Sequence, residues 1–198
     1  TLLKIASPGV PDFYQGSELW DLSLVDPDNR RPVDYSLRRR LLAALRREAA
    51  DDPLALSKRL LRGLTDGILK MHIMSCGLRL RRKHHELFAS GAYTVLEPAG
   101  QRRRHVIAFV RSYGDMQVIV VAGRFFMGLG GAPVQSAVEA ATWVNTFLSA
   151  PRELLLHERY VDLFTGTTIM ADLGRDARQL AMADIFAHLP VALLVARN

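Results

Sequence analysis

The pattern of hydrophobic and polar positions divides the chain near residue 90. Before that point, leucines recur every three or four residues between charged residues, which is the period of amphipathic helices. After it, short runs rich in Val, Ile, Tyr and Phe are separated by turn-forming residues, which predicts strands. We therefore predict an α+β fold, with residues 1–90 largely helical and residues 91–198 forming a separate all-β domain.

The helical pattern predicts three helices, at residues 34–49, 54–62 and 66–87. Asp34 and Thr65 stand at the N-cap positions of the first and third helices, and Gly63 follows the second as a C-terminal stop signal. The expected apolar face of the first helix consists of Leu37, Leu41 and Leu45. The third helix has an apolar stripe of Leu69, Ile73, Cys76 and Leu80.

Seven runs in the second half have the composition of short strands, at residues 93–96, 106–110, 118–121, 140–148, 160–164, 179–183 and 191–195. Turn signals such as "EPAGQ", "GLGG" and "LGRD" separate them. The "GLGG" at 128–131 lacks the Lys-Ser/Thr of a phosphate-binding loop, so we interpret it as a turn. Short strands at this spacing are typical of an antiparallel β-sandwich.

The chain opens with "LLKIA" at 2–6, which we expect to be a buried strand, and continues into a loop at 7–33 without any period. Long ordered loops in small domains are usually functional. This loop contains the pattern Gly-x-Pro-x-x-Tyr-x-Gly-x-Glu, in which Tyr14 offers a sugar a stacking face and a hydroxyl. Gln15 and Glu18 are further candidates for substrate contact, but for Glu18 we favour a role in locking the loop by hydrogen bonds.

The same loop continues as "DPDNRRP" at 26–32. Carboxylate, amide and guanidinium groups are the planar groups that grip polyols, so Asp26, Asn29, Arg30 and Arg31 are candidate substrate-binding residues. The alternative is a loop that satisfies itself through Asp–Arg pairs and Asx turns.

Composition narrows the classes of function. The net charge is +6, but the basic clusters follow helical spacing and no zinc-finger or RNA-binding signature accompanies them, so we expect no nucleic-acid partner. No apolar run reaches the roughly 18 residues of a membrane span, and we expect no membrane partner. The single Cys76 fits a reducing, cytoplasmic compartment. The histidines are scattered, so we expect neither a metal nor another cofactor. The first residue is Thr1, from which we expect a part of a longer protein.

The string "SPGVPDFYQGSELWDLSLVDPDNRRPVDY" at 7–35 resembles the end of the catalytic barrel in the alpha-amylase family of glycoside hydrolases. It resembles most closely those members that isomerise the reducing-end linkage of maltooligosaccharides from α-1,4 to α,α-1,1. The segments at 66–93, 158–166 and 185–194 are similar to later parts of the same enzymes, so the resemblance covers nearly the whole chain.

The resemblance implies that residues 1–90 are the last strand, rim loop and helices of a (β/α)8 barrel, followed by a β-sandwich. It also implies a retaining double displacement by an Asp nucleophile and a Glu acid/base. In the family both carboxylates precede this segment. The nucleophile motif Gly-x-Arg-x-Asp and the motif Asn-His-Asp are absent here. We therefore expect no catalytic residue in this chain, no activity from it alone, and a cleft rim that binds maltooligosaccharide.

Three alternatives remain open at this point. The β-domain is either a carbohydrate-binding module, with Trp143, Phe147 and Tyr160 as a stacking platform, or these aromatics are core, Trp143 and Phe147 lying on one face of a strand. The parent is either the isomerising enzyme or another amylase-family hydrolase or transferase. The apolar faces of strand 2–6 and helix 66–87 either drive self-association or pack onto the chain's own β-domain.

Overall fold

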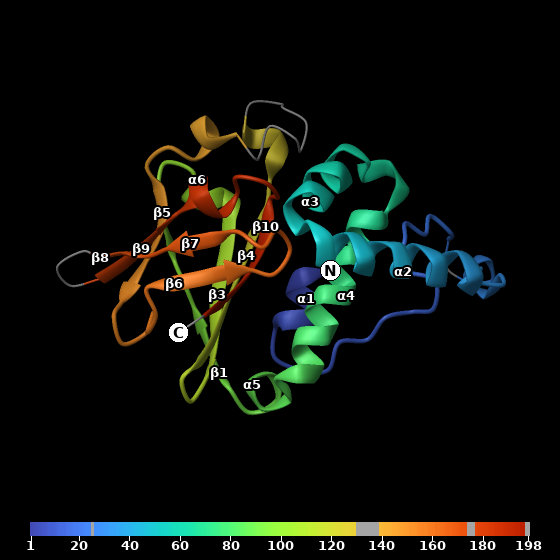
Figure 1. Cartoon of the computed structure of the whole chain (residues 1–198), viewed down its shortest axis with the longest axis horizontal. Helices are drawn as coiled ribbons and strands as arrows, with labels where there is room; N and C mark the ends of the chain where they lie inside the picture. The colour runs from blue at the N-terminus through green and yellow to red at the C-terminus, as the bar shows by residue number, and fades with distance from the viewer. Residues whose placement is uncertain (25, 130–138, 174–176, 197–198) are drawn as a thin grey trace.

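The computed structural model describes residues 1–24, 26–129, 139–173 and 177–196 (Figure 1). The helical elements are α1 (Leu2–Ala6), η1 (Asp28–Arg30), α2 (Tyr35–Asp51), α3 (Pro53–Arg62), η2 (Leu64–Asp66), α4 (Ile68–Lys83), α5 (His85–Ala89), η3 (Arg103–His105), η4 (Phe126–Leu129), η6 (Ala140–Trp143) and α6 (Met182–Ile185). The strands are β1 (Ala92–Val95), β2 (Pro98–Gly100), β3 (Val106–Tyr113), β4 (Met116–Gly123), β5 (Thr146–Pro151), β6 (Arg159–Asp162), β7 (Thr168–Met170), β8 (Asp172–Leu173), β9 (Ala177–Ala181) and β10 (Val191–Ala196).

The strands form two antiparallel sheets, as the sequence predicts for an α+β fold. A six-stranded sheet has the order β1-β3-β4-β10-β6-β7, and a four-stranded sheet has the order β2-β5-β9-β8. The hairpin of β3 and β4 is paired from Val106 opposite Gly123 to Tyr113 opposite Met116. The last strand, β10, lies between β4 and β6 and pairs with both of them near the centre of the larger sheet.

The centre of the six-stranded sheet is buried on both faces. Val118 and Val120 of β4 pack in a core cluster with the helices, whereas the alternating Ile119 and Val121 pack in a second cluster with residues of the four-stranded sheet. Because side chains alternate across a strand, a strand covered on both faces has an unbroken apolar run. The helices therefore form a layer on one face of the larger sheet, and the smaller sheet covers the other face (Figure 1).

Two predicted helices are confirmed with their end signals. The Asp34 side chain accepts a hydrogen bond from the Leu37 amide at 2.8 Å and caps α2. Asp52 caps α3 in the same way, and Gly63 follows the last residue of that helix, as predicted. N-cap carboxylates satisfy amides that have no partner inside the helix.

The predicted helix 66–87 is interrupted. Its main part, α4, ends at Lys83, because His84 has φ −117° and ψ 55° and turns the chain before α5. The proposed cap at Thr65 is wrong: Thr65 lies inside η2, and left-handed Gly67 occupies the N-cap position with φ +74°. The Asp66 carboxylate instead accepts the Ile68 amide at 2.8 Å. The predicted stripe of α4 is confirmed as buried, including the free thiol of Cys76.

The predicted strand at 2–6 is wrong, because these residues form the short helix α1. A strand needs a neighbouring strand to satisfy its amides and carbonyls, and the structure describes no strand before Ala92 in the ranges it covers. The helix satisfies them internally, with the Ile5 amide donating to the Thr1 carbonyl at 3.1 Å. It also buries Ile5 against α4 at Gly77, where a Cβ would approach the Ile5 side chain to 3.1 Å.

Three strand predictions need correction. The run 140–148 is not one strand, since η6 occupies its first part and Asn145, at φ +55°, turns the chain into β5. The predicted turn "EPAGQ" contains β2, and the short strands β7 and β8 were not predicted. Two predicted turns lie partly outside the described residues. The parts outside are residues 130–131 of "GLGG" and residues 174–176 of "LGRD".

Arg111 of β3 connects the helical layer to the sheet. Its side chain is 2% exposed, and its guanidinium donates to the carbonyls of Leu87, Phe88 and Gly91 at 3.0 Å each and to that of Ala6 at 3.3 Å. The apolar faces of α1 and α4 pack onto the chain's own sheet. Self-association, and the division into separate domains at residues 1–90 and 91–198, stay predictions.

Candidate functional site

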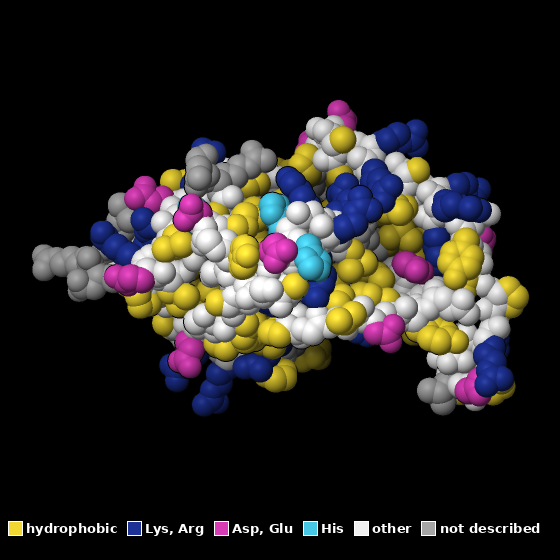
Figure 2. Space-filling model, turned by 90° about the horizontal axis from the view of Figure 1, so that it is seen from below, with side chains coloured by type: hydrophobic (Ala, Val, Ile, Leu, Met, Phe, Trp, Pro, Cys, Tyr) yellow, Lys and Arg dark blue, Asp and Glu magenta, His cyan; other side chains and the backbone are white. Residues whose placement is uncertain are grey.

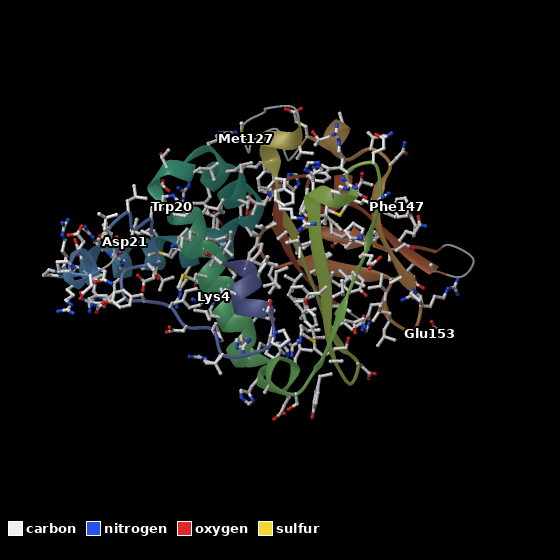
Figure 3. The ribbon with its side chains drawn as sticks, turned by 180° about the vertical axis from the view of Figure 1, so that it is seen from behind. Lys4, Trp20, Asp21, Met127, Phe147 and Glu153 are labelled. Carbon is white, nitrogen blue, oxygen red and sulfur yellow. The ribbon has the colours of Figure 1, made fainter. Side chains whose placement is uncertain are left out.

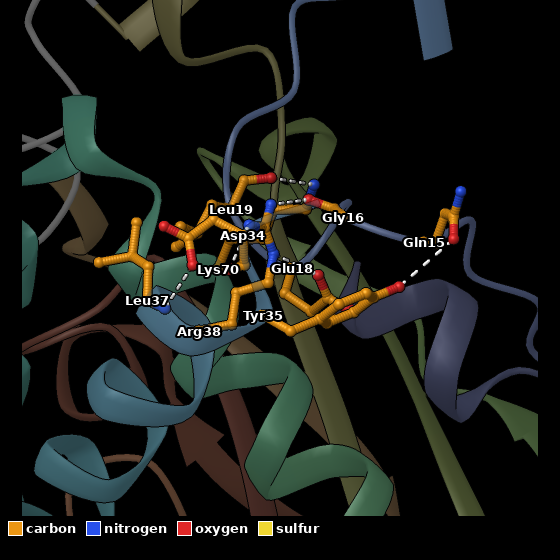
Figure 4. A network of polar contacts seen from close by, with 9 residues as sticks. All are labelled: Gln15, Gly16, Glu18, Leu19, Asp34, Tyr35, Leu37, Arg38 and Lys70. Carbon is orange, nitrogen blue, oxygen red and sulfur yellow. Dashed lines mark hydrogen bonds and ion pairs between the residues drawn. The ribbon is translucent and has the colours of Figure 1, made fainter. Parts of the chain in front are cut away.

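The loop at 7–33 is fastened to the helical layer by Arg38 of α2 (Figure 4). Its Nε donates to the Glu18 carboxylate at 2.9 Å, and its Nη2 donates to the Gly16 carbonyl at 2.6 Å. Gly16 has φ +84°, and a Cβ there would meet the Val33 side chain at 3.0 Å, so the close approach of residue 16 to the end of the loop requires glycine. The loop-locking interpretation of Glu18 is thus confirmed, and its contact with substrate stays a prediction.

Tyr14 and Gln15, which precede Gly16 in the loop, are exposed. The Tyr14 ring is 53% exposed. The Gln15 side chain accepts a hydrogen bond from the Tyr35 hydroxyl at 3.3 Å, which ties it to the first turn of α2 (Figure 4). The structure therefore brings Gln15 and Glu18 together around α2 and leaves an aromatic face beside them free for a ligand.

The second group of candidates is held by its own ion pairs. Arg30 pairs with Asp26, with a hydrogen bond of 2.6 Å from its Nη2, and Arg31 pairs with Asp28 at 3.3 Å. The two arginine side chains are 72% and 74% exposed, so each keeps N–H groups for another acceptor. The buried Oδ1 atom of Asn29 has no hydrogen-bond partner among the described residues. The loop thus has the predicted Asp–Arg pairs, and substrate contact by these residues stays a prediction.

Trp20 is an aromatic of this loop that the sequence analysis did not single out (Figure 3). It is 53% exposed, and its indole N–H donates to the Leu64 carbonyl at 2.6 Å. The Lys70 ammonium lies 5.3 Å from its ring centroid. Gly67 packs so closely that a Cβ would lie 2.5 Å from the Trp20 amide nitrogen. An exposed ring held in one orientation provides a stacking surface. The position of Trp20 two residues after Glu18, within the candidate loop, was the sequence signal that could have identified it as a candidate.

A groove of about 460 Å³ lies between α2 and α4, next to the loop anchor. It is lined by Glu18, Tyr35, Arg38, Arg39, Leu42, Arg46, Met71, Met74, Ser75, Leu78, Arg79 and Arg82. Figure 2 shows basic side chains gathered next to apolar ones on the helical half of the molecule. The groove therefore unites an apolar floor with a strongly basic rim.

A buried polar cluster lies where the helices meet β6 and β10. The Asp162 carboxylate accepts hydrogen bonds from the Thr165 hydroxyl at 2.7 Å and the Leu193 amide at 3.1 Å, and burial raises its pKa to about 6. His72 and Cys76 lie 3.9 Å apart in the same layer, and burial lowers the pKa of the imidazole and raises the pKa of the thiol. Asp162 and His72 are each 2% exposed, so they are part of the packing between the helices and the sheet.

The aromatic platform proposed for the β-domain is wrong. Trp143 is 1% exposed and packs edge-on against Phe186, with ring centroids 4.9 Å apart. Tyr160 is fully buried and donates its hydroxyl to Gln117. Trp143 is core as predicted, but it lies in η6 and not on one strand face with Phe147 of β5. Two of the three rings are thus inaccessible to a sugar.

No protein-family model matches the chain. Proteins named maltooligosyl trehalose synthase from two strains of Mycobacterium tuberculosis, CDC 1551 and H37Rv, are each 38% identical to it over 197 residues, which is 100% of this chain and 20% of the relative. The solved maltooligosyltrehalose synthase of Arthrobacter ramosus superposes with a TM-score of 0.69 at 35% identity, over 98% of this chain and 21% of that structure. The chain is a relative of maltooligosyl trehalose synthases.

The chain spans about one fifth of the length of the curated synthases that it matches. An Anoxybacillus alpha-amylase superposes with a TM-score of 0.54 over 100% of this chain at 15% identity, so it shares the fold. Among the described residues, no helix is long and apolar enough to cross a membrane. Within the same ranges, no three His, Cys, Asp or Glu side chains are grouped to hold a metal ion.

Proposed function

We propose that this chain is the C-terminal part of an intramolecular transglucosylase that converts the reducing-end α-1,4 linkage of a maltooligosaccharide into an α,α-1,1 linkage, a step of trehalose biosynthesis. The observation that carries the proposal is the 38% identity over 197 residues to proteins named maltooligosyl trehalose synthase. The TM-score of 0.69 to a solved synthase agrees with it.

In this enzyme, this chain would contribute part of the sugar cleft, and the rest of the enzyme would contribute the catalytic carboxylates. Retaining transfer needs one carboxylate as nucleophile and another as acid and base. Here the carboxylate of Glu18 is held by Arg38, and that of Asp162 is buried under the helical layer. The nucleophile motif Gly-x-Arg-x-Asp is also absent from the sequence. We therefore place the reacting pair in the rest of the enzyme, whose (β/α)8 barrel would be completed by the helices of residues 1–90 and followed by a β-sandwich at 91–198.

The loop at 7–33 then forms part of the rim of the sugar cleft, because it carries half-exposed aromatic rings and exposed guanidinium groups beside one another in the sequence. Tyr14 and Trp20 offer half-exposed rings to the apolar faces of glucosyl units. Arg30 and Arg31 offer N–H donors to sugar hydroxyls. A transfer that must retain the released glucose also needs a rim that excludes water, and the Glu18–Arg38 anchor keeps the loop in place for that purpose.

The test uses a chimera in which residues 1–198 replace the matching fifth of the Arthrobacter ramosus synthase. An α,α-1,1 linkage has no reducing end, so we expect the chimera to remove the reducing-end signal of maltopentaose without producing free glucose. The isolated chain should do neither. Turnover by the isolated chain would contradict the absence of the catalytic pair, and a folded chimera that only hydrolyses would favour another amylase-family enzyme. Cytoplasmic location stays a prediction.

A further inference from the structure

The two tryptophans of the chain differ in solvent exposure. Trp143 is 1% exposed and belongs to the core between the two sheets, whereas Trp20 in the loop at 7–33 is 53% exposed. A half-exposed indole keeps a large apolar surface in contact with water, which costs free energy that burial would recover. Tryptophan at such positions is typical of binding surfaces, because it combines a large apolar face with one polar N–H group.

Contacts from the turn before α4 and from α4 itself fix the Trp20 ring (Figure 3). The indole N–H donates to the Leu64 carbonyl at 2.6 Å. The Lys70 ammonium lies over the ring, 5.3 Å from its centroid, and donates to the adjacent Leu19 carbonyl at 3.2 Å. At Gly67, a Cβ would lie 3.1 Å from the Cδ1 atom of the ring. The ring is therefore held in one orientation and loses little conformational freedom when a ligand binds.

These contacts also define what the ring offers to a ligand. The N–H is the only hydrogen-bonding group of an indole, and here it is already bonded to Leu64. Lys70 occupies one face of the ring, so a ligand would stack on the opposite face. A flat apolar face without a free donor suits the C–H face of a pyranose ring. It supplies neither a proton nor a charge to a reacting bond.

The residues that follow Trp20 are polar and exposed. Asp21 is exposed, and its carboxylate accepts the Ser23 amide at 3.0 Å. Hydrogen bonds from Ser23 lower the pKa of Asp21, so the carboxylate stays charged at neutral pH. A carboxylate beside an apolar ring can accept hydroxyl groups of the sugar that stacks on the ring. Covering this segment with protein would instead remove water from the charge, which costs free energy.

We propose that Trp20 is a specificity-determining residue that stacks on a glucosyl unit away from the linkage that is changed, and that Lys70 is the positioning residue for its ring. This inference rests on the proposed function. Stacking on an unchanged sugar unit is equally strong in the substrate and in the transition state, so it lowers KM without raising kcat. Trp20 therefore favours maltooligosaccharides long enough to reach its ring.

The test uses the chimera described above, with maltotriose to maltoheptaose as substrates. In Trp20→Ala we expect KM for the longest substrates to rise about two- to tenfold, with kcat unchanged and with no change for the shortest substrates. Trp20→Phe keeps an aromatic face and should retain part of the preference. Leu22→Ala is the matched control, because it removes a 93% exposed apolar side chain from the same loop, and it should have no effect.

Substitutions of Lys70 test its positioning role. Lys70→Met removes the cation over the ring and the bond to the Leu19 carbonyl. We expect KM to rise for the long substrates only, by a smaller factor than in Trp20→Ala. Lys70→Arg keeps a cation and should restore the KM of the original chimera. Equal loss of activity at every substrate length would show that Lys70 only stabilises the fold.

In Trp20→Ala, a fall in kcat or an equal rise in KM at every length would overturn the proposal, because the ring would then contact the reacting unit or pack against protein. Unchanged KM at every length would overturn it as well. If the unsubstituted chimera does not isomerise maltopentaose, the proposed function fails, and acrylamide quenching of the 198-residue chain tests the stacking alone. Maltoheptaose should protect the exposed Trp20 from quenching, and absence of protection would contradict the stacking.

Discussion

The loop at 7–33 and the junction between the helices and the six-stranded sheet differ in the solvent exposure of their polar side chains. In the loop, the ion pairs of Arg30 and Arg31 are more than two thirds exposed on the arginine side. At the junction, Arg111 and Asp162 are each 2% exposed and form hydrogen bonds mainly with the backbone. Water competes with the first set of contacts and not with the second, so we expect stability to reside in the junction and ligand chemistry in the loop.

The largest effect is expected from Arg111→Met. The substitution leaves the carbonyls of Leu87, Phe88 and Gly91 without their buried donor, and we expect the free energy of unfolding to fall by about 3–5 kcal/mol. Urea denaturation measures it. Arg40→Met, at an exposed position of α2, is the control and should change stability by less than about 0.5 kcal/mol. If Arg111→Met and Arg40→Met lower the free energy of unfolding by the same small amount, the claim that stability resides in the junction is wrong.

The next effect concerns Asp162. Its carboxyl has a pKa of about 6 in the folded chain against an ordinary 3.8, so the folded state binds the proton more tightly. This group therefore stabilises the fold fully below about pH 4, and the stabilisation is lost as the pH rises through about 6. Asp162→Asn cannot titrate, and the difference in unfolding free energy between wild type and variant should change over that window. Asp162→Ala leaves buried donors unpaired and should cost about 2–3 kcal/mol at pH 7.

If that difference is flat between pH 4 and pH 6, Asp162 does not titrate with a raised pKa. Asp184→Asn, which removes one carboxylate at an exposed position, is the control.

An intermediate effect is expected at the loop anchor. Arg38→Met removes the bonds to Glu18 and to the Gly16 carbonyl, and we expect a loss of about 1–2 kcal/mol together with faster proteolysis within residues 7–33. Arg39→Met, at the next position of α2, serves as the matched control, because the Arg39 side chain donates to the Ser36 hydroxyl at 3.5 Å and not to the loop in the ranges described. Unchanged cleavage of the loop in Arg38→Met would show that other contacts hold it.

The smallest stability effect is expected for Arg30→Ala. An ion pair so exposed is worth less than about 1 kcal/mol, so the urea midpoint should barely move. In the chimera, the same substitution should raise KM for maltopentaose if the guanidinium contacts sugar. A loss of stability larger than that caused by Arg38→Met would reverse the comparison between exposed and partly buried pairs.

The sequence predicted those parts of the fold whose signals are local. Asp34 caps its helix and the stripe of Leu69, Ile73, Cys76 and Leu80 is buried as expected, because both depend on spacing within a few residues. The failures involve long-range partners. The run "LLKIA" fits a strand or a helix by composition, and its packing against Gly77 decided for a helix.

The candidate site was predictable in part for the same reason. The Asp–Arg pairs of residues 26–31 are close in sequence and were anticipated. The anchor of Glu18 by Arg38, 20 residues away, and the bond from Trp20 to Leu64, 44 residues away, required the fold. Arg111 likewise has no sequence signal that distinguishes it from other basic residues in strands. Its role depends on the packing of α5, whose Phe88 carbonyl accepts a hydrogen bond from its guanidinium.

Native-state hydrogen exchange tests the division between the loop and the junction most directly. The Leu163 amide donates to the Leu193 carbonyl at 3.0 Å and the Leu193 amide donates to Asp162 at 3.1 Å, whereas the loop amide of Ser17 donates to the Tyr14 carbonyl at 3.2 Å. We predict that Leu163 and Leu193 exchange only through global unfolding and that Ser17 exchanges through local opening at a far lower free energy. Comparable protection of all three amides would contradict a fold stabilised at the junction and a loop left free to serve a ligand.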